Sequence, residues 1–238
     1  MTMDIAGKWA LVTGASRGVG QQVALGLAEL GVNLVLHSSN RNNQSETRSL
    51  LQESGIQIHS VEGLLDDPAS ISNFIEEAEN LSGGIDILYN NAATMTPETP
   101  IFNTPQSDYE KSFQVNLYSV IQICAFFAPK MATRGFGRII NVSSGIKDTP
   151  KLDAYSLTKA ALDKYTRDLA VELDGSGVLA NMLDPGWCVT AMGGAGAPNP
   201  VSSVLPGALI PAMLGKEGPE APKGMLFAAQ DFAGINWR

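Results

Sequence analysis

The stretch Trp9–Gly20, WALVTGASRGVG, decides the fold of this chain. Its first residues, Trp9–Thr13, are mostly apolar and include a β-branched valine, which is typical of a buried strand. From Gly18 to Leu30 the apolar residues recur with helical spacing, so a helix is predicted there. Glycines at the junction let the backbone turn sharply. The chain therefore begins with a strand, a glycine turn and a helix.

The glycine turn is also a candidate binding site. A strand-to-helix turn lets the backbone approach a pyrophosphate group, which the positive end of the helix dipole stabilises. The glycines at positions 14, 18 and 20 are spaced differently from the G-x-G-x-x-G dinucleotide fingerprint. A tight turn without a ligand is the alternative, but the position after the first strand of an alternating chain favours a nucleotide site.

The rest of the chain repeats the alternation of short apolar runs and longer amphipathic segments. Repeated βα units form a mostly parallel sheet with right-handed crossovers. We therefore predict a single-domain, Rossmann-type, doubly wound α/β fold over residues 1–238, which are 44% hydrophobic and 17% charged. The predicted strands are Trp9–Thr13, Asn33–His37, Ile56–Val61, Asp86–Tyr89, Gly137–Val142 and Val178–Leu183, and the predicted helices are Gly18–Leu30, Asn43–Glu53, Pro68–Leu81, Gln106–Met131 and Ala154–Asp174.

Charge and cysteine content argue against several classes of function. The net charge is −8 and the chain has no Lys/Arg-rich run, so neither nucleic-acid nor anionic-membrane binding is expected. Cys124 and Cys188 cannot form a disulfide framework, and His37 and His59 have no metal-ligand spacing, so no metal site is expected. The N-terminus lacks an apolar signal segment, and no apolar run approaches the ~18 residues of a membrane span. A cytoplasmic location is predicted.

Tyr155 and Lys159 are the strongest candidates for chemistry. They are four residues apart in a predicted helix, so the phenol and the ammonium share one face. A neighbouring cation favours the phenolate and lowers the pKa of a tyrosine, which makes the residue usable as an acid or a base near neutral pH. A half-buried tyrosine beside a solvated lysine is the alternative interpretation.

Several motifs follow one another along the chain. They are Thr13–Gly20, Asn90-Asn91-Ala92-Ala93, Asn116, Ser143-Ser144, Tyr155 with Lys159, and Pro185-Gly186 with Thr190. Their joint order and spacing resemble the short-chain dehydrogenase/reductase family over about residues 5–190. The tail that begins at Asp184 is similar to the carbonyl-reductase-like members of that family.

The resemblance implies hydride transfer between a nicotinamide cofactor and a carbonyl or alcohol. Tyr155 would give its proton to the carbonyl oxygen, and Lys159 would hold the nicotinamide ribose while lowering the pKa of the tyrosine. Ser144 would hydrogen-bond the developing alkoxide. Because the loop before the tyrosine is shorter than the family's, Ser143 is the alternative. Asn116 would support a water relay to the lysine, with an ordinary polar helix residue as the alternative.

The resemblance also implies a cofactor site. Three departures from the family pattern predict weaker or altered cofactor binding. These are Ala93 in place of a glycine, Leu64 in place of an aspartate that binds adenine, and Leu179 in place of an arginine. The implied cofactor-binding residues are Gly14, Ser16, Arg17, Gly18, Val19, Gly20, Ser38, Leu65, Asn91, Ala92, Tyr155, Lys159, Pro185, Gly186 and Thr190.

The end of the second predicted strand bears on the choice of cofactor. An NAD-preferring site places a carboxylate there, which binds the ribose 2′-hydroxyl and repels a 2′-phosphate. This chain has Ser38 at that position, and no acid is expected nearby. Arg17, with Arg41 as a second cation, is expected to reach the phosphate. We therefore predict NADP(H), with NAD as the alternative.

The segment 191–222 is rich in Gly, Ala and Pro and nearly free of charge. Long segments of this kind are usually functional, so we predict a lid over the substrate. Its apolar side chains indicate a pocket for uncharged carbonyl compounds, with packing on the sheet or a partner subunit as the alternative. These side chains, with one that precedes the segment, are Trp187, Met192, Leu205, Leu209, Ile210 and Met213.

The sequence as a whole predicts an NADP(H)-dependent enzyme that reduces a small uncharged ketone, aldehyde or quinone. An NAD-linked alcohol dehydrogenase and a non-catalytic nucleotide-binding sensor are the alternatives, although binding alone does not need the tyrosine. Apolar residues on more than one face of the two longest predicted helices indicate a homodimer or homotetramer. They include Phe113, Leu117, Ile121, Phe126, Leu162 and Leu169.

Overall fold

The computed structural model describes residues 3–148, 152–215 and 221–235. Within these residues a seven-stranded sheet forms the centre, with spatial order β3-β2-β1-β4-β5-β6-β7. Every pair of neighbouring strands is parallel. The strands are β1 (Trp9–Val12), β2 (Asn33–Ser38), β3 (Ile58–Glu62), β4 (Ile87–Asn90), β5 (Gly137–Val142), β6 (Val178–Asp184) and β7 (Leu226–Ala228).

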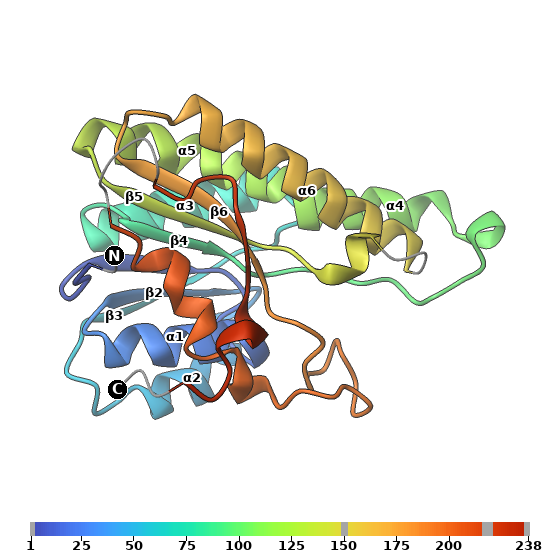
Figure 1. Ribbon diagram of the computed structural model, residues 1–238, viewed down its shortest axis with the longest axis horizontal. Coiled ribbons are helices and arrows are strands. Elements are labelled where there is room, and N and C mark those ends of the chain that lie inside the picture. The colour runs from blue at the N-terminus through green and yellow to red at the C-terminus, as the bar shows by residue number, and fades with distance from the viewer. Residues whose placement is uncertain (1–2, 149–151, 216–220, 236–238) are drawn as a thin grey trace.

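Helices cover both faces of the sheet. The α-helices are α1 (Gly18–Glu29), α2 (Ser45–Leu50), α3 (Pro68–Ser82), α4 (Gln106–Phe113), α5 (Ser119–Arg134) and α6 (Asp153–Glu172), with a π-helix η3 (Gln114–Tyr118). The short 3₁₀ helices are η1 (Arg41–Gln44), η2 (Ile101–Asn103), η4 (Gly145–Asp148), η5 (Val201–Val204), η6 (Gly207–Ala212) and η7 (Ala229–Phe232). Figure 1 shows α1 and α2 on one face and α3, α5 and α6 on the other, with α4 and η2 extending beyond the sheet.

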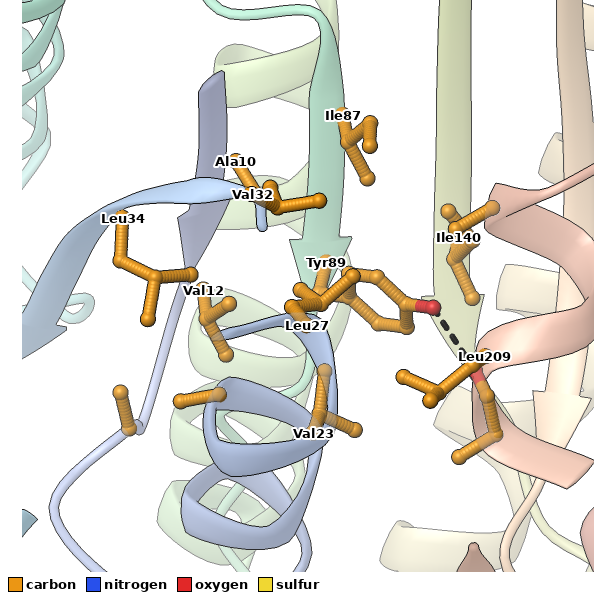
Figure 2. Packing of buried hydrophobic residues seen from close by; sticks show 14 of the residues in the cluster. Ala10, Val12, Val23, Leu27, Val32, Leu34, Ile87, Tyr89, Ile140 and Leu209 are labelled. Atoms are coloured by element: carbon orange, nitrogen blue, oxygen red, sulfur yellow. Dashed lines mark hydrogen bonds between the residues drawn. The ribbon is translucent and has the colours of Figure 1, made fainter. Parts of the chain in front are cut away.

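The core forms two layers because successive side chains of a strand point to opposite faces. On β1, Ala10 and Val12 face α1, whereas Leu11 faces the layer of α3, α5 and α6. On β4, Tyr89 packs in the α1 layer and donates its hydroxyl hydrogen to the Ala208 carbonyl oxygen, 2.7 Å away (Figure 2). The segment around η6 is therefore part of the core.

The order of the strands reverses between β1 and β4. β1, β2 and β3 progress toward one edge, and the chain then returns to place β4 on the other side of β1. In open α/β sheets, the crevice beyond the carboxyl ends of the strands at such a reversal is the usual ligand site. The glycine turn follows β1, and Asn91 follows β4, so both meet at this point.

The predicted doubly wound α/β fold is confirmed. The six predicted strands agree with the structure to within two residues at each end, but β7 was not predicted. The predicted helix 43–53 is shorter in the structure and divided between η1 and α2. The predicted helix 106–131 continues to Arg134 and contains the π-helix η3, in which one turn holds an extra residue.

The helical segment Gln106–Arg134 is long and apolar enough to cross a membrane by length and composition. More than half of its apolar window is buried inside the domain. Ile123 and Phe127 of α5, for example, are fully buried against the sheet. Such burial is typical of the core helix of a globular domain, and core helices pass the same test of length and composition. The test is therefore weak evidence for a membrane span.

Candidate active site

Thr13 joins the glycine turn to the end of β4. Its hydroxyl group donates to the Tyr89 carbonyl at 3.2 Å, and the hydroxyl oxygen accepts from the backbone N–H groups of Asn91 at 2.9 Å and Ala92 at 3.1 Å. The Asn91 side chain in turn donates to the carbonyl of Thr13 at 2.9 Å. Two loops that are far apart in the sequence are thus held together at the switch point of the sheet.

The glycine turn leaves no room for a side chain at Gly20, where the chain enters α1. A Cβ atom on Gly20 would lie 2.3 Å from the Gly14 carbonyl oxygen, and Gly14 itself has a positive φ of 67°. Arg17, which precedes α1, makes no side-chain capping hydrogen bond to the helix. The first N–H groups of a helix lack partners within it, so this end can receive an anion such as a pyrophosphate. The turn therefore fits a dinucleotide.

The remaining predicted residues of the turn differ in exposure. Ser16 and Val19 are half-buried, and Val19 packs against the core below the turn. Arg17 is exposed. Thr190, from the segment after β6, lies close to the turn. A Cβ atom added to Gly18 would be 3.4 Å from the Thr190 methyl carbon.

Tyr155 and Lys159 share one face of α6, as the spacing predicts. Lys159 is 3% exposed, and its ammonium donates to the Val142 carbonyl oxygen at 2.7 Å. The Lys159 Nζ atom lies 5.5 Å from the centre of the Tyr155 ring. The alternative interpretation, a solvated lysine, is excluded by its burial at the end of β5.

The effect of Lys159 on the tyrosine differs from the prediction. Burial raises the pKa of Tyr155 to about 12, the charge of Asp184 also raises it, and a hydrogen bond with Ser144 lowers it. Desolvation is the largest of these three effects on the phenol, and the Lys159 ammonium is engaged with the Val142 carbonyl. Burial lowers the pKa of Lys159 to about 8, and the charge of Asp163 opposes that shift.

The two candidate serines have different partners. The Ser143 hydroxyl donates to Asp163, and Ser143 is 1% exposed. Ser144 hydrogen-bonds Tyr155 and accepts from the backbone N–H of Ile146 at 3.3 Å. The geometry therefore favours Ser144 over Ser143 as the partner of the tyrosine hydroxyl.

Asn116 lies in the π-helix η3 and is 1% exposed. Its side-chain oxygen accepts from the Thr94 N–H at 2.8 Å, and its amide donates to the Thr94 carbonyl at 2.8 Å and to the Thr158 hydroxyl at 3.1 Å. Asn116 thus ties the segment after β4 to α6, one residue before Lys159. This arrangement gives it a structural role beside the predicted catalytic pair.

The end of β2 is more acidic than the sequence indicated. Ser38 pairs with Glu62 of β3, and the Glu62 carboxylate accepts from the backbone N–H of Arg41 at 2.8 Å. The Arg41 guanidinium is bound to Glu77 of α3 at 2.5 Å. The expectation of no acid nearby is wrong, because the register of β2 and β3 brings Glu62 to this edge. The Ser38 hydroxyl is also engaged, since it donates to the Asn40 carbonyl at 2.7 Å.

Leu64 and Leu65 follow β3 and differ in environment. Leu64 is 51% exposed, whereas Leu65 is partly buried against the layer of α3, α5 and α6. An exposed leucine supplies no polar partner to an adenine amino group. The loss of the adenine contact at Leu64 stays a prediction.

The segment after β6 closes the site on a third side. The Asp184 carboxylate accepts from the Gly186 N–H at 2.9 Å, and the Pro185 carbonyl accepts from the Gln230 amide at 2.8 Å. The Thr190 hydroxyl accepts from the Gly193 N–H at 2.9 Å. These contacts fix the turn that follows β6.

The predicted lid, 191–222, divides into two parts in the structure, and residues 216–220 lie outside the described residues. Trp187, Val189 and Met192 are partly exposed, and the Trp187 indole N–H donates to the Gly193 carbonyl at 2.8 Å. Leu205, Leu209 and Met213 instead pack in the α1 layer of the core. For these three the packing alternative is the one observed, while Ile210 is half-buried.

Sequence reasoning missed Glu62, Asp184 and Asp163. Asp184 stands directly before the Pro185-Gly186 motif, and Asp163 follows Lys159 by four residues. Helical spacing could have placed Asp163 beside the lysine. The parallel pairing of β2 with β3 could have placed Glu62 beside Ser38.

Comparison with known proteins identifies the family. Residues 8–199 match the model of the short chain dehydrogenase family, so the chain belongs to it. It is 35% identical to a short-chain type dehydrogenase/reductase of Picea abies over 79% of this chain and 73% of that protein. It is 34% identical to a 3-oxoacyl-(acyl-carrier-protein) reductase of Aquifex aeolicus (strain VF5), over 81% of this chain and 78% of that protein.

The fold agrees with solved structures of the same class. A blue fluorescent protein from a metagenomic library, in complex with NADPH, superposes with a TM-score of 0.83 at 26% identity, covering 95% of this chain and 97% of that chain. The protein is thus an oxidoreductase of the short-chain dehydrogenase/reductase family, with a Rossmann fold that binds NAD(P) and acts on a small molecule.

Proposed function

We propose that the protein is an NADP(H)-dependent reductase of small uncharged ketones, aldehydes or quinones, with Tyr155 as the acid. The observation that carries this proposal is the grouping of Tyr155, Ser144 and Lys159. Ser144 hydrogen-bonds the Tyr155 phenol, and the Lys159 Nζ atom lies 5.5 Å from the centre of the tyrosine ring. Burial raises the pKa of the phenol to about 12, so the phenol holds the proton that a carbonyl oxygen takes up during reduction.

Each residue of the site then has a role. When bound, the nicotinamide ring supplies hydride to the carbonyl carbon. Tyr155 and Ser144 donate hydrogen bonds to the carbonyl oxygen, and Tyr155 transfers its proton as negative charge develops there. Lys159, held on Val142, presents a cation beside the tyrosine. Asn116 holds the Thr94 segment against α6, which fixes the position of the lysine.

Two features support an uncharged substrate. Trp187, Val189 and Met192 present apolar surface in the segment that follows the Pro185-Gly186 motif. Asp184 places a carboxylate close enough to Tyr155 to raise its pKa, so an anionic substrate at the tyrosine would be repelled. We propose that residues 187–200 form the substrate-covering part of the predicted lid.

The proposed function is tested by NADPH oxidation with pairs of carbonyl compounds that differ only in a carboxylate. We expect kcat/KM to be at least about tenfold higher for the uncharged member of each pair, because a poorly screened repulsion of about 1.4 kcal/mol gives that factor. Turnover of carboxylated or phosphorylated compounds alone would refute the proposal. Cofactor binding without turnover of any compound would favour the sensor.

An NAD-linked alcohol dehydrogenase is the second candidate, and Glu62 favours it. A carboxylate beside Ser38 can accept from a ribose 2′-hydroxyl and repels a 2′-phosphate. We give precedence to NADP(H) because Arg17 is exposed in the turn itself, and because the similar structure named above holds NADPH. The preference is expected to be moderated by Glu62 and by Leu64.

Arg17→Ala should weaken the binding of NADPH about tenfold and the binding of NADH less than twofold. The reason is that the guanidinium makes a charge-assisted hydrogen bond to the 2′-phosphate, which NADH lacks. The measurement is the dissociation constant of each cofactor by fluorescence titration. Arg41→Ala is the matched control, since Arg41 is bound to Glu77 and should affect both cofactors slightly and equally. Equal losses of both cofactors in Arg17→Ala would promote the NAD-linked candidate.

We further propose a cytoplasmic homodimer or homotetramer. The side chains that support this assembly differ from those chosen from the sequence. Leu117 and Leu162 are buried in the core, whereas Tyr118, Leu157 and Val171 are 53%, 49% and 75% exposed. These three exposed apolar side chains lie on η3 and α6, which contact one another. A monomeric mass by light scattering at micromolar concentration would count against the assembly.

A further inference from the structure

The last residue of β5 and the two residues that follow it are each bound to a different position on α6. The first and the third of these contacts involve the predicted catalytic residues, and the second involves a buried carboxylate outside that set. The pairs are Val142 with Lys159, Ser143 with Asp163, and Ser144 with Tyr155. The middle contact therefore lies between the two that define the site.

Asp163 is a buried carboxylate with one hydroxyl partner and with cations nearby. It is 2% exposed, accepts from the hydroxyl of Ser143, which follows β5, and has its Oδ2 atom 3.7 Å from the Lys147 Nζ atom of η4. On α6 itself, Lys159 is one turn before it and Arg167 one turn after it. A buried carboxylate is costly unless it is paired and hydrogen-bonded. The Ser143 hydroxyl satisfies Oδ1, whereas the buried Oδ2 atom has no hydrogen-bond partner within the described residues and is balanced by the nearby charge of Lys147.

We propose that Asp163 is a positioning residue, whose buried carboxylate keeps the Lys159 ammonium charged and whose hydrogen bond with Ser143 fixes the segment after β5 that carries Ser144. The inference rests on the proposed function, in which Lys159 acts as a cation beside Tyr155. It gives Ser143 a defined role that differs from that of Ser144.

The charge of Asp163 acts against the effect of burial on the lysine. Burial lowers the pKa of Lys159 to about 8, and Asp163 raises it. Without Asp163 the folded-state pKa would fall further, so the ammonium would lose its proton at a lower pH. Burial raises the pKa of Asp163, and the hydrogen bond from Ser143 and the charges of Lys147 and Arg167 oppose that shift.

The decisive variant is Asp163→Asn, which removes the charge but keeps an oxygen to accept from Ser143. The Lys159 titration is followed by NMR of the ¹³Cε atoms in lysine-labelled protein, which needs no turnover. We expect the Lys159 midpoint to fall by about one pH unit, the size of effect that one nearby charge produces. An unchanged midpoint would overturn the proposal.

The pH profile of kcat/KM provides the second readout. The alkaline limb of the profile should move to lower pH together with the titration midpoint of Lys159. The kcat/KM of the variant should therefore be about tenfold lower than that of the unmodified protein at pH 9 and less than twofold lower at pH 6. A loss of equal size at every pH would indicate a purely structural role and overturn the proposal. A shifted lysine midpoint with no turnover in any variant would refute the proposed function and leave the role of Asp163 intact.

Two further variants complete the test. Asp168→Asn, on the exposed side of α6 where Asp168 pairs with Lys164, should leave both readouts unchanged. Asp163→Glu restores the charge and should return the midpoint toward that of the unmodified protein. If Asp163→Asn does not give a native circular dichroism spectrum, Asp163→Ser, which removes the same charge with a smaller hydroxyl side chain, takes its place.

Discussion

Tyr155→Phe should lower kcat by roughly 10²–10⁴-fold on the best carbonyl substrate, the range that a positioned general acid contributes. The phenylalanine ring fills the same space on α6, so the Lys159 contact with Val142 is preserved. Only the donated proton and the hydrogen bond with Ser144 are lost. Stopped-flow and steady-state kinetics should therefore show a slow chemical step with the dissociation constant for NADPH unchanged within about twofold.

The control for this prediction is Tyr118→Phe. Tyr118 ends the π-helix η3 and is 53% exposed, so removal of its hydroxyl should leave turnover near that of the unmodified protein. Near-native turnover in Tyr155→Phe would show that another group supplies the proton. A parallel loss of NADPH affinity would show that the phenol acts in binding instead.

The second large effect is expected from Gly20→Ala. The added Cβ atom would lie 2.3 Å from the Gly14 carbonyl oxygen and 2.5 Å from the Asn91 amide nitrogen, distances that require the turn to open. Overpacking of this kind costs about 1–3 kcal/mol. We expect the free energy of unfolding in urea to fall by about that amount.

NADPH affinity should fall at least about tenfold in Gly20→Ala, since the first turn of α1 moves away from the phosphate-binding position. Isothermal titration measures this loss. Gly196→Ala is the matched control, because a Cβ atom at position 196 meets open space. A Gly20→Ala protein with native stability and native NADPH affinity would disprove the tight packing of the turn against Asn91.

The fold was predictable because its signals are local. The alternation in β1, with Ala10 and Val12 on one face and Leu11 on the other, is typical of a strand buried on both sides. The helix α3 begins at Pro68 after the capping Asp67 and ends at Gly83 in the left-handed conformation, as its sequence indicates. β7 has only three residues, Leu226–Ala228, too few for a periodic pattern.

The candidate site was predictable only where one segment carries the whole pattern. Tyr155 and Lys159 are on one helix, and Gly14 and Gly20 are in one turn, so spacing was sufficient to relate them. Glu62 and Ser38 are on different strands, and only the register of β2 with β3 brings them together. The pKa of Tyr155 also depends on burial and on Asp184, which no local spacing reports.

The salt bridge of Arg41 with Glu77 also could not be predicted from local spacing. Its neighbours in the sequence are polar and uncharged, so it was expected to be available to a phosphate. Glu77, which binds it, comes from α3, more than thirty residues later. Long-range pairs of this kind depend on how α3 packs after β3, and the sequence alone does not give that packing.

The π-helix η3 holds one more residue in its turn than an α-helix would. The helical segment Gln106–Arg134 therefore contains one residue more than an uninterrupted α-helix with the same number of turns. Since each α-helical residue turns by about 100°, the extra residue rotates α4 relative to α5 by about that angle. Asn116 lies within the widened turn. Deletion of one residue from this turn is therefore expected to restore a continuous α-helix and to change the face that α4 presents.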